Sequence, residues 1–480
     1  MKTTEPGGVD ISSWQDNHAA KDNAYLWYLN KWQRGKEMKE RIIELLSEKK
    51  YHELKSLLAE LNEADISEVL DEVPDEDEAI LFRLLPKDMA ADVFSRMESE
   101  TQESLINKLT DNEIKNIIND LFLDDAVDLI SELPANLVKK ILKNTDASRR
   151  KEINKILEYP EDSAGSIMTT EFVDLRAKMT VKEAFDRIRQ VGSKKETIYT
   201  CYVVDEKRTL VGVVTVKELL LRKYEEVIDD FMETSIITVN THDDKEDVVH
   251  AFDKYDFLAM PVVDLENRLV GIVTVDDAMD VMYDENEEDF EMMAAMAPSE
   301  DTYFNTPVFT QYRNRIMWLL ILMISATFTG GIINHYQEAF ASLPILVSFI
   351  PMIMSTGGNC GSQASTMIIR GLATDEIELN EVFKAWFKEV RIALLVGVTL
   401  AIVNGAQVMM QYGNLMLAIV IGCTIIFTVI LAKSLGCILP MIAKRLNLDP
   451  AIMASPMITT IVDACSILIY FNIAVMLFGI

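Results

Sequence analysis

Hydrophobic and polar positions divide the chain into differently patterned parts. Residues 1–36 are polar with no sustained period, and we interpret them as an N-terminal tail holding one short helix. From Glu37 to about Glu158, short apolar stripes recur at helical spacing between turn signals such as LLPKD and ELPAN. Each proline stands where a new helix can begin. Residues 37–158 are therefore predicted to form an acidic, all-α superhelix of stacked helical hairpins.

An internal repeat follows the helical part. YVVDEKRTLVGVVTVKELL at Tyr202–Leu220 matches PVVDLENRLVGIVTVDDAM at Pro261–Met279 with a constant offset of 59 residues. Each copy has a β-rich run, a polar turn, a second β run and a helix, and a helical stretch precedes it. This order predicts two copies of a small α/β module.

The repeat resembles a tandem pair of CBS domains, spanning about Gly165 to Tyr283. We assign the first module to residues 159–226 and the second to residues 227–283. Such pairs commonly act as ligand-sensing regulators, often of adenine nucleotides, which makes ATP a candidate ligand.

Five long apolar segments fill the last part of the chain, residues 313–480. About 20 apolar residues suffice to cross a bilayer, and each segment reaches that length. The segments lie at about Ile316–Tyr336, Leu343–Ala373, Ala385–Gln411, Leu415–Ala443 and Ala451–Ile480. The sequence therefore predicts a transmembrane domain of five helices.

The loop cations predict the orientation of these helices. Every connection that carries Lys or Arg lies on the side of the soluble part, and the first and third loops carry none. The cations are Arg313, Arg315, Arg370, Lys384, Lys388, Arg391, Lys444 and Arg445. The positive-inside rule then places the N-terminus and the soluble domains in the cytoplasm and the C-terminus outside.

The last apolar segment carries one carboxylate, Asp463, near its middle. An ionised Asp at mid-bilayer costs roughly 2.5 to 3.5 kcal/mol, so such residues usually face a bundle interior or a watered cavity. Ser455, Thr459, Asp463 and Ser466 fall on one side of a helix, which is typical of a lining. The alternative is a structural ion pair with Lys433, which lies at a similar predicted depth.

The second apolar segment contains GGNCGSQAS, in which Gly357, Gly358 and Gly361 stand among Asn359, Ser362 and Gln363. We interpret the glycines as breaks in the helix beside a cavity, because free backbone groups at membrane depth need protein or water around them. A tight helix crossing is the alternative, since small residues also permit close packing.

The charge is distributed very unevenly. The chain has 480 residues and a net charge of -30, yet the first 312 residues hold 68 acidic side chains against 37 basic ones. Such an acidic body argues against nucleic acid as a partner and in favour of cations. The five cysteines show no paired spacing, so neither a disulfide framework nor a thiolate metal site is indicated. The first residues, MKTTEPGGVD, contain no apolar run, so we expect no secretory signal.

An acidic helical stretch, Asp276 to Met296, connects the second module to the membrane segments, and we assign residues 284–312 as an acidic connecting helix. A solvated linker is the ordinary interpretation of such a run. Its place between a sensor module and the membrane favours a regulatory role instead.

Together, the acidic superhelix, the paired CBS modules, the acidic connecting helix, GGNCGSQAS and DPAIMASPMITTIVDA around Asp463 resemble the MgtE magnesium channels. The resemblance implies a homodimer in a bacterial inner membrane. Its pore at the two-fold axis would select Mg²⁺ through paired fifth-helix aspartates, with positions Ser455 and Thr459 contributing. Some relatives carry Asn at the position of Ser455, and residues 1–36 have no counterpart.

The resemblance also implies that cytosolic Mg²⁺, bound by acidic residues, closes the channel. The matching positions in this chain are Asp124 and Asp128 in the superhelix, Asp244, Glu246 and Asp256 in the second CBS module, Asp277, Asp280, Glu285, Glu288 and Asp289 along the connecting helix, and Asp449 before the last span. Apposed acidic surfaces repel when bare and attract when divalent ions bridge them.

The leading hypothesis is thus a dimeric, Mg²⁺-selective and Mg²⁺-gated channel in the lipid bilayer. One alternative is an ion-coupled transporter or a broader Co²⁺/Mn²⁺ carrier, since broken helices with midplane acids also suit alternating access. Another is a membrane-anchored nucleotide sensor, which would not require Asp463. No nucleophile constellation, P-loop or metallohydrolase motif is found, so the sequence does not indicate an enzyme.

Overall fold

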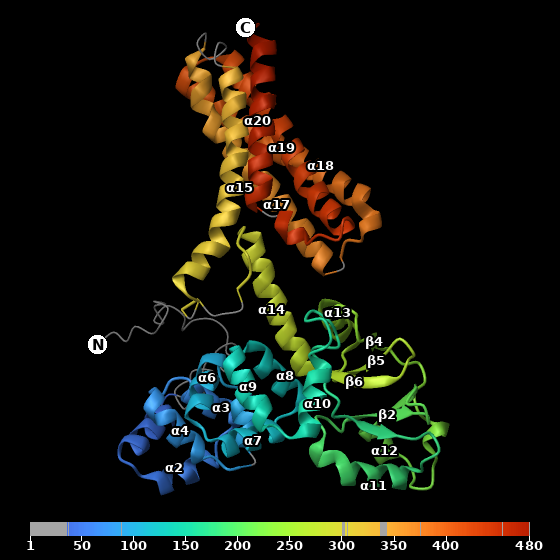
Figure 1. Cartoon of the computed structure of the whole chain (residues 1–480). Helices are drawn as coiled ribbons and strands as arrows, with labels where there is room; N and C mark the ends of the chain where they lie inside the picture. Colours follow the sequence, from blue (N-terminus) through green and yellow to red (C-terminus); the bar gives the residue numbers. More distant parts are fainter. Residues whose placement is uncertain are drawn as a thin grey trace, which may run out of the picture. The chain divides into compact units, whose positions relative to one another are not determined.

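The computed structural model describes residues 36, 38–87, 89–299, 303–304, 306–336, 343–374, 376–453 and 455–479. The chain divides into two compact units, Met1–Val281 and Met282–Ile480. The tail predicted for residues 1–36 lies, apart from Lys36, outside the described residues. Figure 1 traces both units.

The first unit begins with short helices that pack into an all-α domain, as predicted. A helical stretch at 38–47 is followed by α2 (Tyr51–Leu58), α3 (Glu63–Leu70), α4 (Asp75–Arg83), α5 (Ala90–Ser95), α6 (Ser99–Lys108), α7 (Asp111–Asp120), α8 (Leu123–Glu132), α9 (Ala135–Asn144) and α10 (Ala147–Ile156). Pro74 and Pro134 directly precede α4 and α9. Thr110 and Glu113 form a capping box that satisfies free backbone N–H groups at the start of α7.

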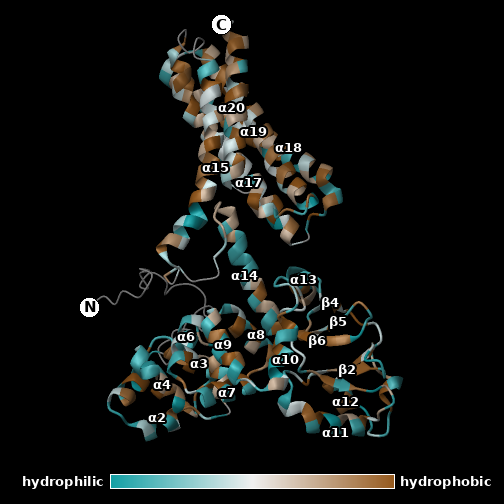
Figure 2. Cartoon of the chain, in the orientation of Figure 1, coloured by the Kyte–Doolittle hydropathy of each residue, from teal (hydrophilic) through white to brown (hydrophobic). Residues whose placement is uncertain are grey.

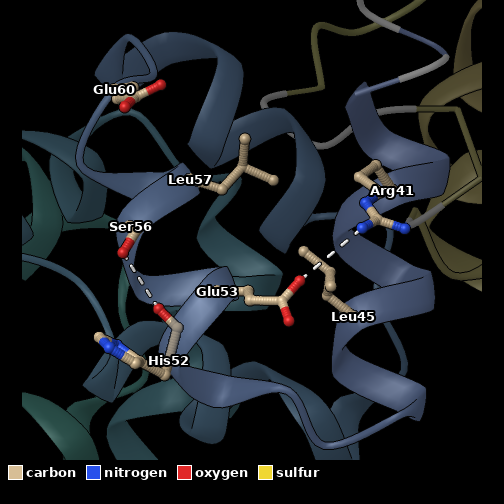
Figure 3. Close-up of a pocket in the computed structure, with 7 residues that line it drawn as sticks. All are labelled: Arg41, Leu45, His52, Glu53, Ser56, Leu57 and Glu60. Atoms are coloured by element: carbon tan, nitrogen blue, oxygen red, sulfur yellow. Dashed lines mark hydrogen bonds and ion pairs between the residues drawn. The ribbon is translucent and has the colours of Figure 1, made fainter.

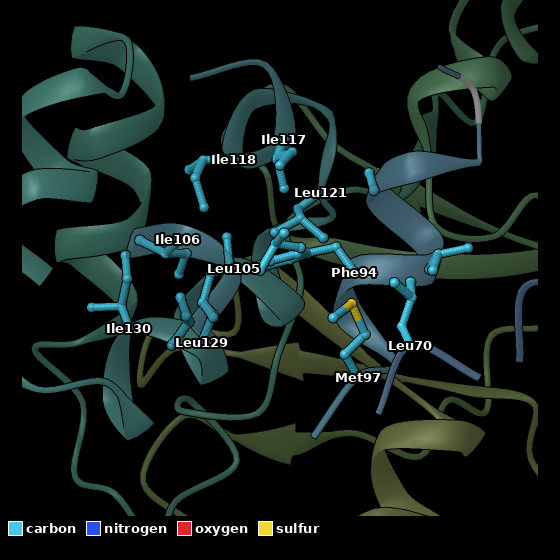
Figure 4. Close-up of a cluster of buried hydrophobic side chains, with 14 of the residues drawn as sticks. Leu70, Phe94, Met97, Leu105, Ile106, Ile117, Ile118, Leu121, Leu129 and Ile130 are labelled. Carbon is cyan, nitrogen blue, oxygen red and sulfur yellow. The ribbon is translucent and has the colours of Figure 1, made fainter. Parts of the chain in front are cut away.

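The apolar stripes of these helices form one shared core. Phe94, Leu105, Ile118 and Ile130 are almost fully buried, although they come from different helices. Figure 4 shows side chains of this cluster meeting between the helices. Short helices of this kind are marginal alone, so the shared core supplies most of their stability.

Two three-stranded sheets follow, one in each CBS module. In the first, β1 (Val173–Leu175) pairs in parallel with β2 (Thr200–Val204), which pairs antiparallel with β3 (Leu210–Thr215). In the second, β4 (Val239–Asn240), β5 (Ala259–Val263) and β6 (Leu269–Thr274) repeat this order. The modules also contain α11 (Val181–Val191), η2 (Gly192–Lys194), α12 (Val216–Leu221), η3 (Ile228–Asp230) and α13 (Lys245–Tyr255).

The repeat is preserved in the strand register. Thr200 lies opposite Thr215 in the first sheet, and Ala259 lies opposite Thr274 in the second, 59 residues further along. Arg208 and Asn267, also 59 residues apart, have positive φ angles of 68° and 59° in the matching turns. The predicted duplication is therefore confirmed down to its turns.

The acidic helix α14 (Val275–Met293) begins directly after β6 and agrees closely with the helical stretch predicted from Asp276 to Met296. The assigned domain boundary at residue 284 falls inside this helix. Thr274 explains this start, because its N–H and hydroxyl both donate to the Asp277 carboxylate and so fix the first turn. Near the other end, Ala295 has a φ of 56° and the Met296 N–H donates to the Glu291 carbonyl, which ends the helix.

The second unit consists of long helices: α15 (Val308–His335), α17 (Ile350–Ala373), α18 (Val382–Tyr412), α19 (Leu415–Arg445) and α20 (Ser455–Phe478), with short 3-10 turns η4 (Pro344–Phe349), η5 (Leu379–Glu381) and η6 (Pro450–Met453). α19 packs against α17, α18 and α20, and α15 packs against α20. Figure 2 shows how hydrophobic residues dominate these helices.

Four stretches in the described part of the chain are long and apolar enough to cross a membrane: Val308–His335, Leu379–Tyr412, Leu415–Arg445 and Pro450–Phe478. The remaining long helix, α17, is less apolar because it carries GGNCGSQAS. Its 24 residues still give it a length of about 36 Å. The multidomain fold is thus confirmed, whereas the count of five spans stays a prediction.

Candidate metal-ion path and acidic sensor sites

The polar side of α20 is the first candidate site. The Asp449 carboxylate accepts a hydrogen bond of 2.7 Å from the Ala451 N–H, which fixes the turn that leads into the helix. Along α20, Ser455 is exposed, and Thr459 and Asp463 are half-buried. The Thr459 hydroxyl donates to the Pro456 carbonyl at 3.0 Å, so its oxygen lone pairs remain available as acceptors.

Asp463 does not pair with Lys433. The Lys433 ammonium lies 3.3 Å from the carboxylate of Glu389 in α18, and both residues are buried. Within the described residues, Asp463 makes no hydrogen bond or ion pair. The predicted alternative of a structural Lys433–Asp463 bridge is therefore wrong, because a carboxylate on another helix satisfies the ammonium.

The prediction of a broken helix at GGNCGSQAS is also wrong. α17 runs without interruption from Ile350 to Ala373, and its glycines lie against neighbouring helices. A methyl group on Gly357 would lie 2.7 Å from the Ser466 Oγ, and one on Gly361 would lie 2.7 Å from the Ile458 Cγ2. The glycines thus serve the tight helix crossing that the sequence left as the alternative, since only a hydrogen fits there.

Ser466 belongs to this packing and not to the lining. Its side chain is fully buried against Gly357, and its hydroxyl has no partner within the described residues. The predicted polar stripe is thereby reduced to Ser455, Thr459 and Asp463. Helical spacing alone placed Ser466 with them because it is only three residues beyond Asp463.

A second polar surface lies on α17, on a side without the glycines. Ser355, Asn359 and Gln363 follow one another at intervals of four residues and are all exposed. The Ser362 hydroxyl is 2.9 Å from the Ser455 hydroxyl, so this surface continues onto the start of α20. The Ser365 hydroxyl donates to the Met453 carbonyl at 2.7 Å and strengthens the same junction.

The second candidate site is a cluster of carboxylates in the first unit. It joins Asp124, Asp125 and Asp128 of α8 to Glu196, which precedes β2, and to Asp276 and Asp277 at the start of α14. Asp124 is only 5% exposed, and one oxygen of Glu196 is buried without a hydrogen-bond partner within the described residues. Three domains of the unit thus contribute acids to one place.

Burial and mutual repulsion raise the pKa values of this cluster. Burial, together with repulsion from Asp277, raises the pKa of Glu196 to about 8. Burial, together with repulsion from Asp276, raises the pKa of Asp277 to about 7, although the hydrogen bonds from Thr274 act in the opposite direction. Although Asp128 keeps an exposed surface, the surrounding protein and Asp277 raise its pKa to about 7. Burial also raises the pKa of Asp124 well above its ordinary range. The main influences on these four carboxyl groups are burial, neighbouring acids and hydrogen bonds, whereas at the adjacent Asp125 the guanidinium of Arg96 partly opposes the rise in pKa that burial causes.

The structure brings together only some of the predicted sensor residues. Asp124, Asp128, Asp277 and Asp280 interact, since Asp277 and Asp280 both raise the pKa of Asp128. Asp244, Glu246 and Asp256 are exposed on or beside α13, where Asp244 caps the helix and Asp256 ends it. Glu285, Glu288 and Asp289 lie on the later turns of α14, in the second unit.

Sequence reasoning missed Asp125, Glu196 and Asp276 as members of the cluster. Asp125 and Asp276 stand next to predicted residues, so the acidic doublets were an available signal. Glu196 follows two lysines in a turn and carries no such signal. In the part of the chain that the structure describes, no group of three or more His, Cys, Asp or Glu side chains is close enough to hold a bare metal ion.

Two cavities lie outside these sites. One, of about 400 Å³, lies between the helical stretch 38–47 and α2 and is lined by Arg41, Leu45, His52, Glu53, Ser56, Leu57 and Glu60. Figure 3 shows Arg41 directed toward Glu53, with a nitrogen to oxygen distance of 3.8 Å. The other, of about 580 Å³, joins both CBS modules and is lined by Tyr199, Thr200, Thr215, Val216, Lys217, Leu220, Leu221 and Leu258.

Known families match most of the chain. Residues 350–473 match a model described as a divalent cation transporter, MgtE. Residues 61–162 match the MgtE intracellular N domain, and residues 164–224 and 228–284 match the CBS domain.

The chain is also similar to named proteins. It is 35% identical over 333 residues to the magnesium transporter MgtE of Bacillus subtilis, covering 69% of this chain and 73% of that protein. It is 35% identical over 329 residues to the magnesium transporter MgtE of Thermus thermophilus, covering 68% and 73%. A crystal structure of the soluble part of a magnesium transporter matches with a TM-score of 0.50 and 32% identity, covering 52% of this chain and 99% of that structure.

Proposed function

The chain belongs to the MgtE family of magnesium transporters, and from this premise we propose that it is a Mg²⁺-selective channel whose pore ion is held by Asp463. The observation that carries the proposal is the state of this carboxylate. Asp463 is half-buried in an apolar helix and has no partner within the described residues. A carboxylate at membrane depth without a protein cation is suited to hold a passing one.

The polar surface of α17 supports a water-filled path beside Asp463. Ser355, Asn359 and Gln363 are exposed in the single chain, and exposing amides to lipid is unfavourable. A second copy related by a two-fold axis would cover this surface and bring two Asp463 side chains together. We therefore propose a homodimer with the pore between the two subunits.

The chemistry of Mg²⁺ fits such a pore. Mg²⁺ loses its water reluctantly and is usually bound by one or two carboxylates with several waters retained. Two Asp463 carboxylates would hold the hydrated ion, and the hydroxyl oxygens of Thr459 and Ser455 would accept hydrogen bonds from its waters. One carboxylate oxygen of Asp449 accepts the hydrogen bond from the Ala451 N–H. Its second oxygen would attract ions near the cytoplasmic end of the pore.

The acidic cluster of the first unit supports closure by cytosolic Mg²⁺. Repulsion among Asp124, Asp128, Asp277 and Glu196 disfavours the state in which they are close, and a hydrated divalent ion would relieve it. Carboxylates that act through the ion's water shell do not need to lie at direct ligand distance. α14 begins in this cluster and continues into the second unit, so it would carry the change toward the membrane.

The other predicted acids would extend this response. Asp244, Glu246 and Asp256 lie around α13 with exposed side chains, and Glu285, Glu288 and Asp289 continue the acidic series along α14. We propose that Mg²⁺ ions bound at each of these two sets contribute to closure of the channel.

The cavity of about 580 Å³ in the CBS pair is the proposed place for ATP. Its size suits a nucleotide, and its lining is mostly apolar with Lys217 as a cation for phosphate. A Leu258→Glu variant should lose ATP binding, measured by calorimetry, without losing Mg²⁺ transport. Unchanged ATP affinity would place the nucleotide elsewhere or remove it.

The decisive experiment is Mg²⁺ uptake by the purified chain in proteoliposomes, followed with an internal Mg²⁺ dye. Asp463→Asn should abolish uptake, since the pore loses its only charged ligand, while dimer size in detergent stays unchanged. Glu381→Gln is the matched control, because Glu381 is a partly exposed acid paired with Lys384 at the start of α18, and its uptake should stay normal. Normal uptake by Asp463→Asn contradicts the proposal.

The same vesicles test the alternatives. Single-channel current steps support a channel, whereas slow saturable flux supports an ion-coupled transporter. A broken helix had favoured alternating access, but α17 is continuous, so this feature no longer supports an ion-coupled transporter. Competition by Co²⁺ and Mn²⁺ measures how broad the selectivity is.

A further inference from the structure

The Glu389–Lys433 pair is a charged site that the proposed pore does not use. Glu389 is 8% exposed and Lys433 is 5% exposed, and they join α18 to α19 with a separation of 3.3 Å. Lys433 lies 12 residues before the end of α19, about 18 Å along the helix axis. Glu389 lies seven residues after the start of α18, between Lys388 and Arg391, so the pair lies toward the end of α18 that the loop cations mark as cytoplasmic. Two buried charges at this depth still need each other as partners.

Packing of α18 on α19 does not require these charges. A methyl group on Gly397 of α18 would lie 3.2 Å from the Ile426 Cα, and one on Gly422 of α19 would lie 3.6 Å from the Ala401 Cβ. The two helices thus contact closely through small and apolar residues over several turns. Replacing a buried ion pair with well-packed apolar residues is often neutral or stabilising, so stability alone gives a weak reason to keep it.

An ion pair does what an apolar contact cannot, because it fixes one register between two helices. Apolar side chains tolerate sliding and rotation, whereas an ammonium displaced from its carboxylate is left unpaired in a medium of low dielectric. Glu389 and Lys433 therefore set the rotation and height of α19 relative to α18.

The residues beside Lys433 transmit this register to α17. A methyl group on Gly361 of α17 would lie 3.4 Å from the Ala432 carbonyl oxygen. Gly436 lies against the Gly361 carbonyl, and a methyl group there would be 3.0 Å from the Ala364 Cβ. A rotation of α19 by part of a turn would drive a larger residue into these close contacts, so α17 would have to move with it.

α17 is in turn connected to the polar side of α20. Gly361 faces Ile458, and Gly358 faces Thr459, where a methyl group would lie 3.0 Å from the Thr459 Cγ2. Ser362 and Ser365 are bonded to Ser455 and to the Met453 carbonyl. A chain of contacts therefore runs from the ion pair through α19 and α17 to the helix that carries Asp463.

We infer that Glu389 and Lys433 are positioning residues that set the width of the ion path, and thereby its discrimination among divalent cations, by fixing α19 against α18. This inference rests on the proposed function of Asp463. The net charge of the pair is zero, so the pair itself adds no net charge to the ion path.

The test compares three variants of the full chain, purified as the wild type is. Glu389→Met/Lys433→Met replaces the pair with apolar residues of similar length and should fold with a melting temperature at least equal to that of the wild type. Glu389→Asp keeps the charge but shortens the reach. Glu381→Gln/Lys384→Gln removes an ion pair of 2.7 Å at the start of the same helix, where Lys384 is exposed, and serves as the matched control.

The readouts are the half-saturating Mg²⁺ concentration and the ratio of Mg²⁺ to Ca²⁺ uptake in proteoliposomes. For folded Glu389→Met/Lys433→Met we expect the ratio to fall about tenfold, as is typical when a supporting residue of a metal site is lost. Glu389→Asp should give a smaller change in the same direction, and the control should match the wild type. A merely structural pair would change the melting temperature and leave the ratio unaltered.

Asp463→Asn in the same assay separates this inference from the proposed function. If Glu389→Met/Lys433→Met and Glu389→Asp keep wild-type selectivity while Asp463→Asn shows no uptake, the positioning role is wrong. The pore proposal is then unaffected. Uptake by Asp463→Asn overturns the pore proposal itself. If the double variant fails to fold, the ratio measured for Glu389→Asp decides the inference in the same way.

Discussion

The two units of this chain place buried and half-buried carboxylates in opposite surroundings. In the second unit, the Glu389 carboxylate is paired with the Lys433 ammonium. The Asp463 carboxylate has no partner within the described residues. In the first unit Asp124, Asp277 and Glu196 gather, and burial and mutual repulsion raise their pKa values. Identical chemical groups thus form an ion pair and an unpartnered acid in one unit and a mutually repelling cluster in the other.

If the proposed function holds, this difference would let the same cation act in two ways on one protein. A single unpaired carboxylate in a rigid helix binds without a change of structure, which suits passage. A cluster of mutually repelling carboxylates changes its stability when a cation arrives, which suits regulation. The unpaired carboxylate needs close packing around its helix. The carboxylate cluster needs domains that can separate.

The largest expected effect comes from breaking the rigid packing of the second unit. Gly436→Val places a branched side chain against the Gly361 carbonyl and Ala364, where even one methyl group has no room. Overpacking of this kind costs about 1 to 3 kcal/mol, and more where backbone is the obstacle. We expect little folded protein by size-exclusion chromatography. Gly405→Val is the control, since nothing lies within 4 Å of its added carbon, and it should assemble normally.

A smaller effect should follow from removing charge in the repulsive cluster. Glu196→Gln relieves repulsion with Asp277 and Asp125, so the Mg²⁺-free unit Met1–Val281 should become more stable by about 1 kcal/mol. For a unit of this size that raises the melting temperature by about 3 °C. The further stabilisation given by millimolar Mg²⁺ should shrink. A lower melting temperature, or an unchanged Mg²⁺ response, contradicts the account of the cluster.

The pH dependence of the same unit tests the pKa values directly. Folding raises the pKa of Glu196 to about 8 and those of Asp128 and Asp277 to about 7, above their unfolded values. The folded state therefore binds more protons, and stability falls as pH rises from about 4 to about 8. Without Mg²⁺ the melting temperature should be lower at pH 8 than at pH 6. With Mg²⁺, which competes with protons, this difference should narrow.

The smallest effect is expected for an exposed acid of the same unit. Asp244 is exposed and caps α13 through a 3.0 Å hydrogen bond from the Glu246 N–H. Asn caps as well as Asp, so Asp244→Asn should change the Mg²⁺-free stability by less than about 0.5 kcal/mol. A stabilisation as large as that of Glu196→Gln would show that an exposed acid is repelled by its neighbours as strongly as the acids of the cluster. The cluster would then not differ from the rest of the first unit.

Much of the fold followed from local pattern. The spacing of apolar residues predicted the helical domain, and the 59-residue offset predicted two modules whose registers match at Thr215 and Thr274. The acidic stretch from Asp276 was also predicted to be helical, and α14 begins one residue earlier, where the Asp277 carboxylate fixes the first turn. The role of the α17 glycines was predicted wrongly, since a glycine gives the same local signal at a break and at a close crossing.

By itself, the sequence determined which segments are apolar, that one module is duplicated, and that a single acid lies near the middle of the last helix. These are properties of neighbouring residues, and hydrophobic periodicity reports them directly. Only the tertiary structure decided that Lys433 binds Glu389, that Ser466 faces Gly357, and that Glu196 joins the acids of α8 and α14. Those contacts join residues far apart in the chain, and their energies depend on distance and burial, which no local pattern contains.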